Sequence, residues 1–379
     1  MTRGLLVVAL AALLFPVRGA RAQSDDPPRP RLDDAAADTN DWEAYYTRGM
    51  LALQRSPTAA EPYFFWAARL APGRGEAHFG RWASFWRREE GLWRKYVQGD
   101  RETVESPRVA RVDSLLALAL HRNPFVDQAM LVILYAQLPG DFRGDARTVA
   151  FLKYAGGEYA KAAQILGKEI ARHPARRETL GYDRALALVR AGQLDSATTE
   201  LQLVLAMLRK RDARHTVRVY QSKELLEYAI GLLLLSRGDT AAARASMERA
   251  LTENLAFAPA HDALARLALI RGDTATAVRE RAQAVELHPL DGYLRQQYGG
   301  ALLVAGRPLD ALDQFRRAVE LEPYYADPYY GIAAAHDLAG DSTAAAREYE
   351  DYLARAPRRA SALRQHAERR LAALRAAGK

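Results

Sequence analysis

Apolar residues between positions 224 and 359 recur mostly at intervals of three and four, the spacing of one face of an α-helix. In the stretch GGALLVAGRPLDALDQFRRAVELEP, residues 299–323, the pattern is interrupted by a glycine and ends at a proline. Glycine readily takes the left-handed backbone that ends a helix, and proline stops the next helix and redirects the chain. Each such stretch therefore predicts two short helices joined by a turn.

The same pattern returns every 34 residues through four units, 224–257, 258–291, 292–325 and 326–359. Its columns are Gly238, Gly272, Gly306 and Gly340; Ala243, Ala277, Ala311 and Ala345; Ala250, Ala284 and Ala318; and Pro289, Pro323 and Pro357. A fixed period indicates one repeated supersecondary unit. Alanine lets two crossing helices approach closely, and the aspartates at 239, 273 and 341 are expected to cap each second helix.

These columns resemble those of tetratricopeptide repeats. The small first-helix residues are Gly231, Ala265, Gly299 and Ala333, and the second-helix aromatic column holds Phe315 and Tyr349. The resemblance implies an all-α fold, a right-handed superhelical solenoid of helix-turn-helix units closed by a C-terminal capping helix. It also implies that the first helices form a concave binding wall. Further units are expected from about Arg143 and Glu178, with degenerate units before them.

The chain divides by composition and pattern into five segments. They are a signal peptide (1–22), a disordered leader rich in Pro and Asp (23–40), degenerate aromatic-rich repeats (41–142), the tetratricopeptide array (143–357) and a basic capping helix (358–379). Within them we expect one long helix over 76–98, an isolated apolar helix over 128–138 and a longer loop or helix extension over 212–223.

The first residues have the pattern of an export signal. Arg3 precedes an apolar run that ends at Phe15, and Ala20-Arg21-Ala22 then forms a small-x-small cleavage site. A membrane-spanning helix needs ~20 apolar residues, more than this run contains. We therefore expect cleavage after Ala22, a periplasmic or secreted protein and no transmembrane segment after cleavage. Because the chain has no cysteine, packing alone must hold it together.

The formal net charge of +8 is concentrated in the last 25 residues. Such a basic end could contact anionic headgroups, lipopolysaccharide or nucleic acid. A capping helix with an arginine-rich outer face explains it better, and export makes nucleic acid the least expected partner.

The outward positions of the predicted first helices carry tyrosines and polar residues. The predicted partner-binding groove comprises Tyr182, Tyr228, Asp262, Arg266, Tyr293, Gln296, Gln297, Tyr330 and Asp337. Tyrosine supplies contact area at low entropic cost, and the polar side chains supply directional hydrogen bonds. This mixture suits a peptide segment or a partner helix, although any one tyrosine could instead pack against the neighbouring unit. The Lys and Asn clamp that tetratricopeptide domains use for a terminal carboxylate is absent.

All five tryptophans precede residue 94, and Phe79, Trp82, Trp86 and Trp93 share one face of the expected long helix. An aromatic stripe at helical spacing is typical of a core. The alternative is a platform for sugar rings, by which the protein would contact a cell-envelope polysaccharide.

No catalytic motif is present: the sequence contains no HExxH, no GxSxG and no phosphate-binding glycine loop. Glu89 and Glu90 are adjacent, so on a helix they point about 100° apart. We expect no enzyme, no cofactor and no metal site, and an enzyme built around His78, Glu89 and Glu90 is a remote alternative. The sequence thus predicts an exported scaffold or adaptor that binds a protein partner through its groove, with polysaccharide organisation as the alternative.

Overall fold

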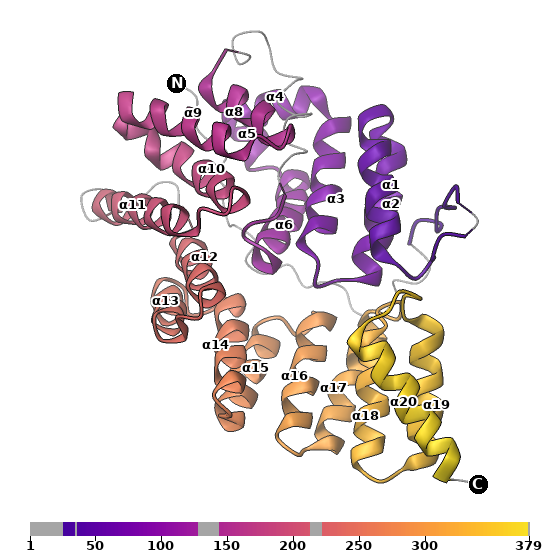
Figure 1. The fold of residues 1–379 in the computed structure, drawn as a ribbon. Helices are drawn as coiled ribbons and strands as arrows, with labels where there is room; N and C mark the ends of the chain where they lie inside the picture. Colours follow the sequence, from indigo (N-terminus) through magenta and orange to yellow (C-terminus); the bar gives the residue numbers. More distant parts are fainter. Residues whose placement is uncertain (1–25, 35, 128–143, 213–221, 378–379) are drawn as a thin grey trace. The chain divides into compact units, whose positions relative to one another are not determined.

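The computed structural model describes residues 26–34, 36–127, 144–212 and 222–377, and within these ranges every regular element is a helix (Figure 1). The α-helices are α1 (Trp42–Arg55), α2 (Pro57–Leu70), α3 (Gly75–Arg88), α4 (Glu90–Gln98), α5 (Arg101–Val104), α6 (Pro107–Arg122), α8 (Ala146–Ala155), α9 (Tyr159–Arg172), α10 (Arg177–Arg190), α11 (Leu194–Asp212), α12 (Lys223–Ser236), α13 (Thr240–Glu253), α14 (Ala258–Ile270), α15 (Thr274–Leu287), α16 (Gly292–Val304), α17 (Pro308–Leu321), α18 (Asp327–Leu338), α19 (Ser342–Arg355) and α20 (Ala362–Ala377). The predicted all-α class is confirmed. The expected signal peptide, the apolar segment 128–138 and residues 213–221 of the expected loop lie outside the described residues.

The chain forms two compact units. The first comprises Met50–Glu61 and Gly75–Leu255, and the second comprises Pro62–Arg74 together with the described parts of 16–49 and 256–379. From α8 onward each unit is a stack of helix pairs, in which the second helix of one pair packs against the first helix of the next pair within the unit.

The turn between the two helices of a pair is set by its glycine. The backbone angle φ lies between 71° and 82° at Gly157, Gly192, Gly238, Gly272, Gly306 and Gly340, as predicted for the bends. Asp239, Asp273 and Asp341 then each accept a hydrogen bond of 2.9–3.0 Å from the backbone N–H three residues later. These contacts satisfy donors that a helix start leaves open. At the equivalent position Arg307 gives no side-chain cap, and Pro308 in the first turn has no N–H to satisfy.

Small residues mark the places where helices cross. Ala243, Ala277, Ala311 and Ala345 are fully buried. A Cβ atom added at Gly299 would lie 2.6 Å from the Phe315 ring, and one added at Gly331 would lie 2.5 Å from it. The Phe315 ring of α17 is thus wedged between the first helices α16 and α18, so both glycines are required by close approach.

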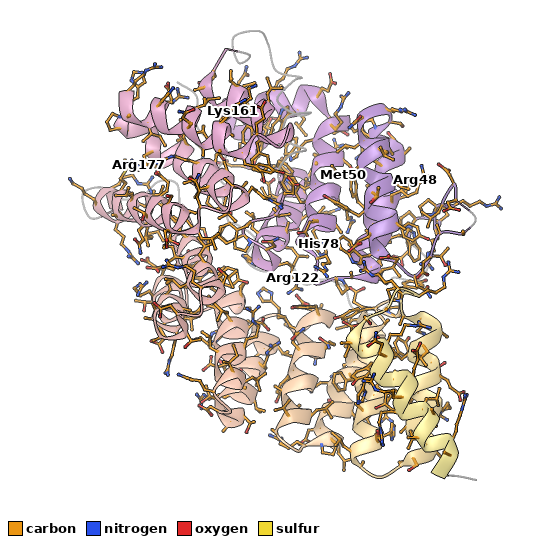
Figure 2. All side chains as sticks on the ribbon, viewed as in Figure 1. Arg48, Met50, His78, Arg122, Lys161 and Arg177 are labelled. Atoms are coloured by element: carbon orange, nitrogen blue, oxygen red, sulfur yellow. The ribbon has the colours of Figure 1, made fainter. Side chains whose placement is uncertain are left out.

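Buried acids link neighbouring helices in the first unit. Glu227 of α12 is 1% exposed and accepts hydrogen bonds from Arg209 of α11 and from Ser246 and Arg249 of α13, at 2.8–3.0 Å. Glu200 of α11 is likewise buried and pairs with Arg177 of α10 (labelled in Figure 2). Since a buried charge is tolerated only when it is paired, these acids fix how their helices meet. The periodic columns of the sequence do not predict these two acids.

The expected long helix over 76–98 is wrong, because the chain breaks at Glu89 into α3 and α4. The break lets Trp93 of α4 fold back to within 5.4 Å of Trp86 and 6.0 Å of Trp82, measured between ring centroids. Burial of three indole rings outweighs continuity of one helix. These rings are 0–1% exposed, so their interpretation as core is confirmed.

Asp113 of α6 lies against this aromatic core. Its carboxylate accepts hydrogen bonds from Trp82 Nε1 at 3.1 Å and from the Tyr96 hydroxyl at 3.0 Å. Burial raises the pKa of Asp113 to about 6, although both hydrogen bonds act in the opposite direction.

The described part of the Pro- and Asp-rich leader makes contacts that its composition did not predict. The Trp66 indole donates to the Pro27 carbonyl at 3.0 Å, and the Arg29 guanidinium donates to the Tyr45 hydroxyl at 3.0 Å while lying over the Trp66 ring. Arg48, labelled in Figure 2, pairs with Asp33. The described part of the leader thus packs against aromatic rings of α1 and α2.

Helix α20 covers the last helix pair, as predicted for a cap. Ala367 and Leu371 are buried against Tyr349 and Tyr352 of α19, while Leu363, expected on the same stripe, remains 37% exposed. The arginines lie on the other sides of the helix.

Candidate functional site

The two predicted groove residues of the first unit do not face solvent, and their expected outward orientation is wrong. Tyr182 and Tyr228 are 4% and 6% exposed. The Tyr182 hydroxyl donates to the Pro124 carbonyl, and burial raises the pKa of that hydroxyl. Every residue of α12 from Glu224 to Gly231 is buried, so Tyr228 has no open face. Neither ring can offer stacking area to a partner in this conformation.

Two groove residues of the second unit are bound by one buried arginine. Arg281 of α15 is 2% exposed and contacts Asp262 of α14 at 2.6 Å and the amide oxygen of Gln297 of α16 at 2.8 Å. One second-helix side chain therefore ties together two successive first helices. Asp262 and Gln297 serve this connection rather than an open surface.

Two more groove residues are held by the capping helix. The Tyr330 hydroxyl lies 2.9 Å from His366 Nδ1, and Asp337 accepts two hydrogen bonds of 2.7 and 2.8 Å from Arg370. The hydrogen bonds from Arg370 lower the pKa of Asp337. Helix α20 thus occupies the first-helix face of α18, where the next repeat would otherwise pack.

Three groove residues, on α14 and α16, keep some solvent exposure and make no such ion pair. Arg266 is exposed and makes no ion pair with any described residue, and Gln296 is half-buried with its amide oxygen facing no described donor. Tyr293 is half-buried, and a Cβ atom added at Gly73 would lie 2.5 Å from its ring. The candidate site is therefore smaller than the predicted groove.

An apolar row that sequence analysis missed lies beside these residues. Ile270, Val304 and Leu338 end α14, α16 and α18, stand 34 residues apart, and are 63%, 64% and 64% exposed. The signal was present in the sequence as a further column two residues before each turn glycine. Periodicity alone does not distinguish these positions from core positions, because most apolar residues of a helix face inward.

The row continues the predicted groove on the same helix faces, because residues four apart on a helix are neighbours. The resulting first-helix stripes are Asp262-Arg266-Ile270, Gln296-Gly300-Val304 and Tyr330-Ala334-Leu338. A Cβ atom added at Gly300 would meet nothing within 4 Å, so the middle of the second stripe is open. Asp262 and Tyr330, which begin the first and third stripes, are engaged within the unit, so the part of these two stripes that remains open is the exposed apolar end.

The basic C-terminal segment is largely neutralised within the unit. Arg375 pairs with Glu350 at 2.6 Å, and Arg364 pairs with Glu368 at 3.0 Å while also donating to backbone carbonyls after α19. With Arg370 bound to Asp337, these charges stabilise the cap. This arrangement agrees with the preferred interpretation of the basic tail as a cap.

The described residues offer little for small-molecule chemistry. They contain no group of three or more His, Asp or Glu side chains that could hold a metal ion. The cavity beside the buried Arg147–Asp183 pair measures about 10 Å³, room for about one water molecule. Glu89 and Glu90, the carboxylates of the remote enzyme alternative, pair with Arg108 and Arg87. No helix in the described ranges has the length and apolarity needed to cross a membrane.

No family model matches the chain. A segment of 118 residues, 31% of the chain, is 36% identical to a TPR repeat-containing protein of Pseudomonas aeruginosa, of which it covers 48%. The chain thus spans about half the length of this relative.

Three solved structures illustrate what the fold is similar to. The MamA protein is 16% identical with a TM-score of 0.40, covering 48% of this chain and 92% of its own. YrrB, described as a TPR protein with an unusual peptide-binding site, is 20% identical with a TM-score of 0.42, covering 55% and 99%. The C-terminal part of a TPR repeat-containing protein from Cytophaga hutchinsonii is 16% identical with a TM-score of 0.46, covering 55% and 78%.

The decisive features are in the chain itself. Four in-register columns of glycine, alanine and proline recur every 34 residues, and the helix pairs bend at those glycines and cross at those alanines. These features, and the 36% identity of one segment to the TPR repeat-containing protein of Pseudomonas aeruginosa, are what this chain shares with tetratricopeptide repeat proteins.

Proposed function

We propose that this protein is a scaffold that binds a protein partner on the first-helix stripes of α14, α16 and α18. The observation that carries the proposal is the row of Ile270, Val304 and Leu338, three apolar side chains about two-thirds exposed at one position of three successive repeats. A single exposed apolar residue needs no explanation, but a regular row beside an unpaired arginine is typical of an interaction surface.

The stripes also suggest what the partner presents. Apolar side chains at regular intervals would bury the row, and an acidic group would pair with Arg266. The open space over Gly300 would accept one bulky side chain between the first and third stripes. An amphipathic helix or an extended segment with an acidic residue meets these requirements.

Site-specific photo-crosslinking tests the surface. A photoreactive residue at position 304 should crosslink a partner in extract of the source cells, whereas the same residue at position 309 should not. Leu309 is a suitable comparison because it is 73% exposed in the same unit but lies on a second helix.

A triple substitution then measures the row itself. Ile270→Ser, Val304→Ser and Leu338→Ser together should reduce affinity for the crosslinked partner at least tenfold. The matched control is Leu290→Ser, Leu309→Ser and Leu363→Ser, which removes three exposed apolar residues outside the stripes. Equal affinity of the two triple variants would contradict the proposed surface.

We further propose that the protein is exported and works in the periplasm or outside the cell. The support is the sequence pattern of residues 3–22, a basic residue, a short apolar run and a small-x-small site. N-terminal sequencing of the protein from fractionated cells should give Gln23 as the first residue in the periplasmic or medium fraction. An uncleaved chain in the cytoplasmic fraction would contradict export.

A further inference from the structure

Residues 36–43 lie on the turn between α19 and α20, more than 300 positions away in sequence. The Arg358 backbone N–H donates to the Asp38 carboxylate at 2.5 Å, and its guanidinium donates to the Ala36 carbonyl at 2.9 Å. The Asn40 amide donates to the Ala354 carbonyl at 3.0 Å. We call these residues the acidic strap, and residues 354–359 the receiving turn.

The strap completes its contacts at the start of α1. Arg359 lies 2.7 Å from the Glu43 carboxylate and 3.7 Å from that of Asp41. The hydrogen bond that Arg359 donates to the Glu43 carboxylate raises the pKa of the Arg359 guanidinium. The receiving turn thus contributes two arginines, one backbone N–H and one backbone carbonyl. The strap contributes carboxylates, a backbone carbonyl and an amide that pair with these groups.

All these contacts are polar, and most lie at the surface. The side chains of Arg358 and Arg359 are 65% and 44% exposed, and that of Glu43 is 51% exposed. Exposed ion pairs contribute little to stability and are screened by salt. The strap is therefore held weakly at each point, and its occupancy depends on its being tethered to the same chain, which gives an effective concentration on the order of millimolar.

A different set of contacts joins α2 to the end of α17. Arg69 pairs with Glu322 at 2.5 Å with both side chains mostly buried, and the Trp66 ring meets the Tyr324 ring at a centroid distance of 4.7 Å. These contacts are independent of the acidic strap. Release of the strap from the receiving turn would leave them in place.

We propose that the receiving turn is a docking site for an acidic peptide segment, and that the acidic strap is its resident and exchangeable occupant. The segment that fits carries carboxylates placed for the Arg358 N–H and for Arg359, and an amide placed for the Ala354 carbonyl. A partner protein with such a segment displaces the strap and takes over its contacts. This site is separate from the first-helix stripes and does not depend on the function proposed for them.

Hydrogen exchange of the full chain tests whether the strap is releasable. Arg358→Ser with Arg359→Ser should speed exchange of the amides of residues 36–43 at least tenfold, and raising the salt from 0.05 to 0.5 M should speed it in the wild type. Arg369→Ser, which removes an exposed arginine of α20 with no ion pair to a described residue, is the control and should change nothing. Unchanged exchange in the double variant would overturn the proposal.

Binding in trans tests the docking site itself. A labelled peptide of residues 34–45 should bind the full-length variant Asp38→Asn, Asp41→Asn, Glu43→Gln at least tenfold more tightly than the wild type, because the resident strap competes less. Adding Arg358→Ser and Arg359→Ser to that variant should abolish binding. The proposal is overturned if the triple variant binds the peptide no more tightly than the wild type does. It is also overturned if the triple variant binds a peptide carrying the same three substitutions as tightly as it binds the unsubstituted peptide.

Discussion

The repeats of residues 258–359 and the helices of residues 75–122 build their cores in opposite ways. In the repeats, alanines and glycines at the crossings bring helix backbones close together, and one fully buried ring, Phe315, fills a slot made by two glycines. In α3, α4 and α6 the space between helices is filled by three tryptophans and two phenylalanines instead.

The two regions differ in how far apart in the sequence the residues lie that determine each helix boundary and crossing. A repeat is specified joint by joint, because glycine sets the bend, aspartate caps the next helix and alanine sets the crossing. Helices α3, α4 and α6 have no such repeated local signals, and the path of the chain there depends on where large rings can be buried. Four experiments, ordered from the largest expected effect to the smallest, test this contrast.

Trp86→Ala should have the largest effect. Trp86 is fully buried and lies within 6.3 Å of the Trp82, Trp93 and Tyr96 rings, measured between centroids. Its truncation should lower the free energy of unfolding of the first unit by about 3–5 kcal/mol. Urea unfolding followed by tryptophan fluorescence measures the loss. Leu152→Ala, at a site 54% exposed in the same unit, should change it by less than about 1 kcal/mol.

Asp113→Asn should remove a pH dependence of the free energy of unfolding of the first unit. The pKa of Asp113 is raised to about 6 by burial, whereas the unfolded chain titrates near 3.9. Its protonated form therefore favours the folded state below about pH 4, and this contribution, at most about 3 kcal/mol, is lost as the pH rises through about 6.

Asparagine keeps an acceptor for the Trp82 indole and has no charge to bury. The unfolding free energy of the wild type relative to Asp113→Asn should thus fall between pH 4 and pH 7. A constant difference across that range would mean that Asp113 ionises normally.

Two adjacent glycines of α16 should respond in opposite directions. Gly299→Ala places a Cβ atom 2.6 Å from the Phe315 ring and should destabilise the second unit by about 1–3 kcal/mol. Gly300→Ala meets nothing within 4 Å and should stabilise it by about 0.5–1 kcal/mol, because alanine favours a helix. Thermal unfolding of the two variants distinguishes crossing geometry from helix propensity. If both variants were more stable than the wild type, close packing of Phe315 against Gly299 would be refuted.

Asp273→Ala should have the smallest effect. Loss of the hydrogen bond to the Thr276 N–H should cost about 1 kcal/mol. Asp273→Asn, which retains the acceptor, should restore most of it. Faster hydrogen exchange confined to the first turn of α15 would locate the effect at the cap.

The helix boundaries and turns of the repeats in the second unit could be predicted from the sequence, because the signals for them are local. Gly272, Asp273 and Ala277 lie within six residues, and each acts on the turn or crossing where it stands. The break at Glu89 was missed because it depends on Trp93 reaching Trp86, and no local signal marks it.

The candidate site was foretold only in part. The burial of Tyr182 depends on Pro124, 58 positions earlier, and the engagement of Asp262 and Gln297 depends on Arg281 of another helix. Periodicity alone placed these residues on the correct helices without showing what covers them. The row through Val304 was visible in the same 34-residue register.

The equal exposure of Ile270, Val304 and Leu338 has an evolutionary consequence. Duplication or loss of one 34-residue unit would lengthen or shorten the row by a single apolar step while preserving every joint. Selection could therefore lengthen or shorten this exposed row by copying or deleting whole units, without changing any residue within a unit.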